Sequence, residues 1–341
     1  MADSNHLKNI AIVGVGLSPT LRHHQEFTDR QILQAGGNVG SAALKHLLAS
    51  DREFNITIVT HEGSKSTFPS SPSIAVKKGS YDDAAFLQNA MKDQDAVVLA
   101  LGFFGMGEQP KLIEAAAKAG VKYILPTEYA GDGLNKEMVD AVPVFHGKRE
   151  ARQQIEQLGA KWIGVATNPW ADQSLRLGLC GVDLFNKKAT LYSDSKVFNM
   201  STLNQVGLGI ARLLSLPTSN PENPRASLEH YTNNFVYISS FLVTQGRILL
   251  SAQEATGTSD SDWTMETDTV AEWIKRCKEQ MAQGDRTGMM GITFAYYLGE
   301  GLGGNYTDKA VEDMQVLGLE MEDFDAKVKE EVEKGPMPKL F

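Results

Sequence analysis

The sequence predicts an α/β protein: a Rossmann-type doubly wound parallel sheet followed by a smaller α+β substrate-facing portion. Short apolar runs alternate with amphipathic helices through the first half, as in sheets buried on both faces. Glycines stand between the first strand and the first helix, where a dinucleotide fold binds pyrophosphate. After residue 168 the alternation stops. We therefore expect a nucleotide-binding domain over residues 8–168 and a smaller portion, without an independent core, over residues 169–330.

Composition narrows the function classes. The chain has 341 residues, 42% of them hydrophobic, and a net charge of −9. That charge, with no Lys/Arg run, disfavours binding to nucleic acid or to an anionic membrane. The longest nearly apolar run, residues 96–107, is too short to span a bilayer. The two cysteines, Cys180 and Cys277, form neither a disulfide framework nor a metal-ligand spacing, so we expect a cytoplasmic protein without a metal site.

The strands and helices follow from periodicity and end signals. In the first half, strands are expected over residues 8–13, 54–60, 74–77, 95–101, 121–126 and 162–166. The helices between them are expected over residues 41–49, 82–91, 109–119 and 147–158. In the second half we expect a hairpin over 188–198, helices over 202–214, 245–254 and 270–282, and strands over 235–239 and 262–267. The charged tail, with EEVEK at 330–334, is interpreted as a solvated face.

The glycine motif is interrupted. Gly14 ends the first strand, but the remaining glycines of the turn appear only after residue 34. If residues 15–34 are removed, the join reads IAIVG-AGGNVG, a GxxGxxG pattern directly between strand and helix. The residues assigned to this phosphate-binding turn are Gly14, Gly36, Gly37, Asn38, Val39 and Gly40.

Two interpretations of residues 15–34 stay open. The segment can be a translated, retained intron: a Val15 codon begins with GT, Gln34 can be CAG, and Thr28-Asp29 can encode a branch-site-like sequence. The alternative is a genuine surface insertion, since long loops add little closure entropy, although one inside a phosphate turn would be unusual.

The end of the second strand favours NADPH over NADH. An NAD site usually places an acidic side chain there to bind the ribose 2′-hydroxyl. Here the residues that could hold a 2′-phosphate are Thr60, His61, Ser64 and Lys65. Glu62, in the same turn, carries a negative charge that would repel a 2′-phosphate. Leu101 and Gly102, at the end of the fourth strand, complete the expected cofactor contacts.

Several motifs resemble those of the NmrA-like, isoflavone-reductase-like branch of the atypical short-chain dehydrogenases. They are GAGGNVG after removal of the segment, GSY at 79–81, DAVVLALG at 95–102, QPKLIEAAAKAGVK at 109–122, LPTEYAGD at 125–132, FHGKREARQQIEQLGAKW at 145–162 and VYISSFLVTQGRIL at 236–249. The resemblance is strongest to fungal aromatic-alcohol-reductase-like oxidoreductases. It implies an NADPH-dependent reductase, as in the plant relatives that reduce isoflavones, phenylcoumaran ethers and lignans.

The resemblance also implies a catalytic lysine. The family's K-x-x-x-R-x-x-I-E stretch is matched by Lys148, Arg152, Ile155 and Glu156. Short-chain dehydrogenases usually carry a tyrosine four residues before their lysine, and here Val144 takes that position. Lys148 must then act directly or through water, or else only bind the nicotinamide ribose. As an acid or base it needs a pKa lowered by burial.

Aromatic residues near the expected strand ends suggest a pocket for a flat substrate. They are Phe103, Phe104, Tyr129 and Trp170, with Phe198 as either pocket or core, and Phe294, Tyr296 and Tyr297 in a segment that can cap the site. We therefore expect an NADPH-dependent reductase of a small aromatic or conjugated substrate, possibly in secondary metabolism. The alternative is a non-catalytic, NAD(P)-sensing regulator of the NmrA type that binds a protein partner.

Overall fold

A parallel sheet of seven strands organises the protein. The computed structural model describes residues 5–14, 37–285 and 287–338, apart from the side chains of Phe103 and Phe104. The sheet strands are β1 (Asn9–Val13), β2 (Asn55–His61), β3 (Ile74–Gly79), β4 (Ala96–Leu99), β5 (Tyr123–Leu125), β6 (Lys161–Ala166) and β10 (Asn234–Tyr237). The apolar residues of the inner strands are buried from both sides, as the continuous runs predict, whereas the edge strand β3 leaves Val76 exposed.

The strand order β10-β6-β5-β4-β1-β2-β3 is that of a doubly wound sheet. All neighbouring strands in it are parallel; Ile12 of β1, for example, lies between Ile58 of β2 and Val98 of β4. The chain leaves β1 toward β2 on one side and returns to β4 on the other. The crevice at the carboxyl ends of β1 and β4 is where such sheets bind ligands.

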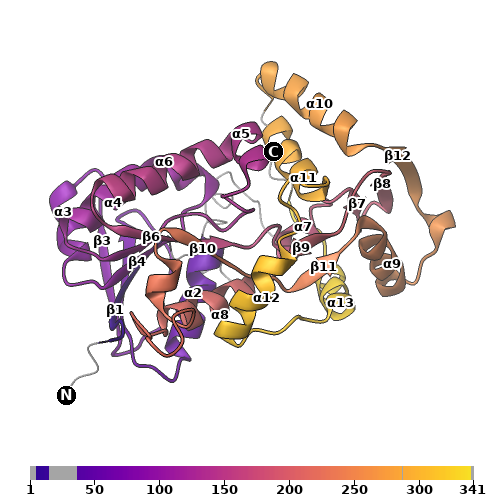
Figure 1. Ribbon diagram of the computed structural model, residues 1–341. Helices are drawn as coiled ribbons and strands as arrows, with labels where there is room; N and C mark the ends of the chain where they lie inside the picture. The colour runs from indigo at the N-terminus through magenta and orange to yellow at the C-terminus, as the bar shows by residue number, and fades with distance from the viewer. Residues whose placement is uncertain (1–4, 15–36, 286, 339–341) are drawn as a thin grey trace.

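Helices cover both faces of this sheet (Figure 1). One face carries α2 (Asn38–Leu48) packed on α8 (Leu203–Leu214), and the other carries α3 (Ala84–Met91), α4 (Gln109–Lys118) and α6 (Val144–Gln157). The remaining helical segments are η2 (Phe103–Glu108), α5 (Lys136–Ala141), α7 (Ala171–Ser174), η3 (Leu228–Tyr231), α9 (Gln245–Thr256), η4 (Asp260–Asp262), α10 (Val270–Ala282), α11 (Thr287–Leu298), α12 (Thr307–Leu317) and α13 (Phe324–Lys334). No helix within the described residues has the length and apolar character needed to cross a membrane.

The second half contributes two small sheets, and the predicted hairpin over 188–198 is wrong. One sheet has the order β12 (Thr264–Asp268), β8 (Lys188–Tyr192), β7 (Val182–Asp183), and the other joins β11 (Phe241–Val243) to β9 (Phe198–Met200). The residues between β8 and β9 bond outward: Ser193 N–H donates to the Asp268 carbonyl and Lys196 N–H to that of Leu298. These outward bonds direct β8 and β9 into different sheets.

The apolar interior divides into two clusters, and the second draws on Met138 and Phe145 of the first half, so it does not belong to residues 169–330 alone. The first cluster fills the Rossmann sheet and also takes in α8, β10 and part of α12, which come late in the chain. The second holds the small sheets, α9 and α11, with Phe198 and Phe241 among its buried side chains. The cores therefore do not divide at residue 168, because α8 and β10 return to the first one. The boundary at 168 stays a prediction.

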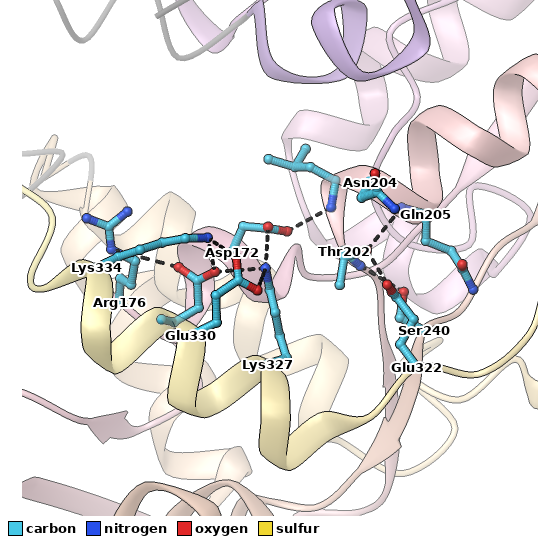
Figure 2. A network of polar contacts seen from close by, with 12 residues as sticks. Asp172, Arg176, Thr202, Asn204, Gln205, Ser240, Glu322, Lys327, Glu330 and Lys334 are labelled. Carbon is cyan, nitrogen blue, oxygen red and sulfur yellow. Dashed lines mark hydrogen bonds and ion pairs between the residues drawn. The ribbon is translucent and has the colours of Figure 1, made fainter. Parts of the chain in front are cut away.

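A buried ionic network joins the last helix, α13, to α7 and to the start of α8 (Figure 2). Lys327 of α13, 9% exposed, lies 2.7 Å from Asp172 of α7 and 2.8 Å from Glu331. The other carboxylate oxygen of Asp172 accepts the N–H of Leu203, the first residue of α8. Glu331 belongs to the EEVEK run yet is fully buried. The solvated-face interpretation is therefore wrong for this residue, because helical spacing turns it inward with Lys327 and Val328.

Lys327→Met should lower the free energy of unfolding by about 3–5 kcal/mol, because it leaves two carboxylates without the buried cation that joins them. Urea unfolding measures this. Lys275→Met, which removes an exposed lysine paired with Glu272 on α10, is the matched control and should leave stability nearly unchanged. A loss of under about 1 kcal/mol for Lys327→Met would contradict the role given to the network.

Candidate cofactor and active site

The two ends of the interrupted glycine turn meet in the structure. Gly14 follows β1 with φ of +89°, and a Cβ there would overlap the carbonyl oxygen of Ala100. A Cβ on Gly40, in the first turn of α2, would lie 3.1 Å from the Gly14 oxygen. The contact at Gly14 requires glycine, and the tight fit at Gly40 shows how closely helix and strand approach each other, as in a dinucleotide site.

The first turn of α2 is built to receive an anion. The helix begins after Gly37, and within the described residues no side chain caps it. The N–H groups of Asn38, Val39 and Gly40 thus stand at the positive end of the helix dipole, beside the Gly14 turn. Gly36, the remaining glycine assigned to this turn, lies outside the described residues. This cradle fits a pyrophosphate group.

The end of β2 presents the groups predicted to select the cofactor. Thr60 is buried, whereas His61 and Lys65 are exposed and Ser64 is half-buried. The His61 ring meets the ring of Tyr81, from the GSY stretch, edge-on at 5.7 Å between centroids. The end of β3 adds a residue that sequence reasoning missed: exposed Lys78 donates from Nζ to the Ser64 carbonyl at 3.4 Å. The register of β2 and β3 brings Lys78 to this site, since Lys78 pairs with Thr60.

Lys148 is buried at the end of β5. It projects from α6, is 5% exposed, and donates from Nζ to the carbonyls of Thr127 and Glu128 at 2.5 and 2.9 Å. Burial lowers the pKa of Lys148 to about 8, the Glu128 carboxylate opposes the shift, and the Arg152 cation adds to it. The amine is therefore close to its titration point at mildly alkaline pH.

The loop that contacts Lys148 is fixed by hydrogen bonds from Thr127 to α4 and β4. Thr127 N–H donates to the Gln109 side chain at 2.7 Å, and its hydroxyl donates to the Leu99 carbonyl at 3.0 Å. The N–H of Leu101, beyond the end of β4, donates to the same hydroxyl at 3.4 Å. Leu101 and the adjoining Gly102 are thus fixed beside the Lys148 loop, at the sheet edge that also carries Gly14.

A buried ion pair lies one helical turn beyond Lys148. Arg152 donates to one carboxylate oxygen of Glu128 at 2.5 Å, with the side chains 8% and 1% exposed. The second guanidinium arm donates to the Gly133 carbonyl at 3.1 Å. Glu128 belongs to the LPTEYAGD stretch, and its role was not predicted from the sequence. The pattern alone carries no signal for it, because a glutamate in a loop is ordinarily solvated.

The predicted aromatic residues separate into different surroundings. Tyr129 is buried, its hydroxyl has no partner within the described part of the chain, and burial raises its pKa. Trp170 is half-buried beyond the end of β6 and donates from its indole to Thr167 at 3.1 Å. Phe198 is a core residue. Phe103 and Phe104 lie in η2, after β4.

A cavity of about 420 Å³ lies in the second half, between the β8 sheet and α11. Its apolar lining comes from Leu177, Leu179, Tyr192, Trp273, Met290 and Phe294. Phe294 packs edge-on against Tyr297 of the same helix, and a Cβ on Gly131 would lie 2.8 Å from the Tyr297 ring. Helix α11 thus stands between this cavity and the loop of Tyr129, and the cavity is not lined by the cofactor edge.

Comparison with known proteins agrees with this geometry. A sequence family described as NAD(P)H-binding matches residues 35–175. Oxidoreductase aprR of Aspergillus flavus is 26% identical over 301 residues, covering 86% of this chain and 95% of the relative. Phenylcoumaran benzylic ether reductase PT1 of Pinus taeda is 35% identical over 100 residues, covering 29% of this chain and 32% of the relative.

The chain is thus similar to isoflavone-reductase-like oxidoreductases and matches an NAD(P)H-binding family over residues 35–175. The structure of AtPrR2 with NADP+ and (+)pinoresinol has the same fold, with a TM-score of 0.67 and 16% identity over 95% of this chain and 98% of the other. The predicted Rossmann fold and the oxidoreductase class are thereby confirmed, and the matches agree with the predicted resemblance. The individual site residues stay predictions.

In this chain residues 15–34 interrupt the phosphate turn in the sequence, and the matched range begins directly after them, at residue 35. Deleting Val15 to Gln34 should strengthen NADPH binding, because it ties Gly14 to the start of α2 and removes residues that binding would have to order. The full chain should bind poorly. Fluorescence titration of both forms, with transcript sequencing, checks this. Tight binding by the full chain, together with transcripts that uniformly encode the segment, would identify a tolerated genuine insertion.

Proposed function

We propose that the protein is an NADPH-dependent reductase of a small aromatic or conjugated substrate, with Lys148 as its proton donor. The observation that carries the proposal is the buried Lys148 amine with its pKa lowered to about 8, at the sheet edge shared with the glycine cradle. A proton donor is most effective when its pKa lies near the working pH. Relatives named for a phenylcoumaran benzylic ether and crystallised with pinoresinol support an aromatic substrate class.

The cofactor would be held by residues already described. Gly14, Gly37 and the first turn of α2 fit the pyrophosphate, and His61, Ser64, Lys65 and Lys78 fit a 2′-phosphate. Bound NADPH supplies a hydride to an electrophilic carbon of the substrate. The protein's task is to orient both molecules at the carboxyl ends of β1, β4 and β5 and to exclude water from them.

Lys148 provides the proton. Two of its three N–H groups donate to the Thr127 and Glu128 carbonyls, and no third acceptor is found within the described residues. The remaining N–H can then donate to a substrate oxygen that gains negative charge as the hydride arrives. Val144 occupies the place of the usual tyrosine, so the ammonium gives its proton directly and regains it from water. Activity should decline above about pH 8, as the ammonium form is lost.

NADPH should bind more tightly than NADH, because His61, Lys65 and Lys78 outnumber Glu62 around the ends of β2 and β3. Fluorescence titration with each cofactor measures the difference. Lys65→Gln and Lys78→Gln should weaken NADPH binding and leave NADH binding unchanged. An equal affinity for the two cofactors, or a preference for NADH, would sink the assignment.

Lys148→Ala should reduce kcat by about 10²–10⁴-fold while the fold stays intact. The assay is NADPH oxidation, screened against aromatic carbonyls, conjugated enones and benzylic ethers. Arg149→Ala is the matched control, since Arg149 is the next residue on α6 and is 44% exposed. If cofactor affinity collapses but single-turnover chemistry survives, Lys148 binds the ribose and is not the donor. Absence of turnover with every substrate would instead favour the regulator alternative.

A further inference from the structure

Lys148 does not stand alone in the interior. It shares α6 with Arg152, four residues later and on the same face, and both side chains reach the loop after β5. Glu128 of that loop meets both of them. Its carbonyl oxygen accepts from Lys148, and its carboxylate accepts from Arg152. Glu128 therefore accepts hydrogen bonds from two buried cations.

The carboxylate of Glu128 is only partly compensated. Arg152 meets Oε1, whereas Oε2 is buried without a hydrogen-bond partner within the described residues. Leaving a buried carboxylate oxygen unpaired is costly, so its presence calls for a physical explanation. A glutamine would keep the Arg152 contact without the negative charge. The retained charge therefore points to an electrostatic role for Glu128.

We propose that Glu128 is a positioning residue for Lys148: its backbone fixes the amine, and the charge balance between its carboxylate and Arg152 sets how readily Lys148 gives up its proton. The inference rests on the proposed function of Lys148. Glu128 favours the ammonium form and Arg152 disfavours it, because like charges repel and opposite charges attract at short range in a low dielectric.

Other groups around Lys148 are accounted for. Tyr129, in the same loop, remains neutral because burial raises its pKa. Asp132, further along the loop, is engaged by the hydroxyl of Tyr237 at 2.9 Å and by Lys309 at 2.6 Å. From α4, the residue that meets the loop is Gln109, an uncharged amide. Asp140 of α5 is paired with Lys136 at the surface. The Glu128–Arg152 pair thus remains as the charge balance next to the amine.

The test is a direct titration of Lys148. The full chain is labelled with ¹³C at lysine Cε, and the Lys148 resonance is assigned by its loss in Lys148→Met. Glu128→Gln should lower the pKa of Lys148 by about one unit, since the Arg152 cation is then unopposed. Arg152→Gln should raise it by a similar amount. The double variant should return it close to its original value, as expected for coupled neighbours.

Arg152→Lys is the conservative control: it retains the cation and should leave the titration in place even where it costs stability. Opposite shifts distinguish charge balance from mere support, because a structural role would not move the two single variants in opposite directions. The inference is overturned if both single variants shift the same way, or if neither shifts. If Glu128→Gln does not fold, Arg152→Gln decides by the sign of its shift. Because no substrate is needed, loss of the proposed function would show separately, as absent turnover by the unaltered chain.

Discussion

The parallel direction of all seven central strands is the constraint on which the rest of the molecule depends. It brings the ends of β1, β2, β4 and β5 to a single edge, although these ends lie far apart in sequence. Gly14, the His61 turn, Leu101 and the Thr127 loop are neighbours for that reason alone. Each following helix must return to the opposite edge, so helix N-termini also face the ligand edge. The dipole of α2 and the buried Lys148 loop are two products of one topology.

Burial of charge is the second theme, and it serves two purposes. In the α13 network, Lys327 joins Asp172 and Glu331, and Asp172 also accepts from the first residue of α8, so the network links three helices. At the β5 loop, Arg152 and Glu128 are equally buried, yet one carboxylate oxygen stays unpaired and an amine with a lowered pKa lies beside them. Glu331 Oε2 of the α13 network likewise has no hydrogen-bond partner within the described residues, and Arg176 lies 3.9 Å from it. What distinguishes the β5 loop is the amine with a lowered pKa beside its ion pair.

The sheet could be predicted from sequence because each strand is a local apolar run and each helix a local periodicity. Thr244, for example, caps α9 as a threonine before a helix should. What could not be predicted depends on distant partners. The SDSK residues after Tyr192 read as a hairpin turn, but Asp268 and Leu298 take their hydrogen bonds. Glu331 reads as surface charge until Lys327 and Arg176 are placed around it.

The candidate site divides along the same line. Lys148 could be named only through the resemblance, since a lysine within a polar helix has no local signal of burial. Arg152 was named as part of the same motif, but its partner was not, because Glu128 lies twenty-four positions earlier in the chain, in the loop after β5. Lys78 was missed since its relevance comes from β2–β3 register. A sequence pattern finds residues whose neighbours are close along the chain, and a site assembled at strand ends is mostly made of the others.

The divided glycine turn shows how folding and ligand binding impose different demands on one segment. β1 is held by its pairing with β2 and β4, and α2 by packing on α8, so Gly14 and Gly40 meet whatever connects them. Extra chain between two fixed points costs only a slowly growing closure entropy. The cofactor is more demanding, because it needs the N–H groups of the turn itself. In the sequence, residues 15–34 stand between Gly14 and the rest of that turn. The fold can therefore form around an insertion that the ligand must still accommodate.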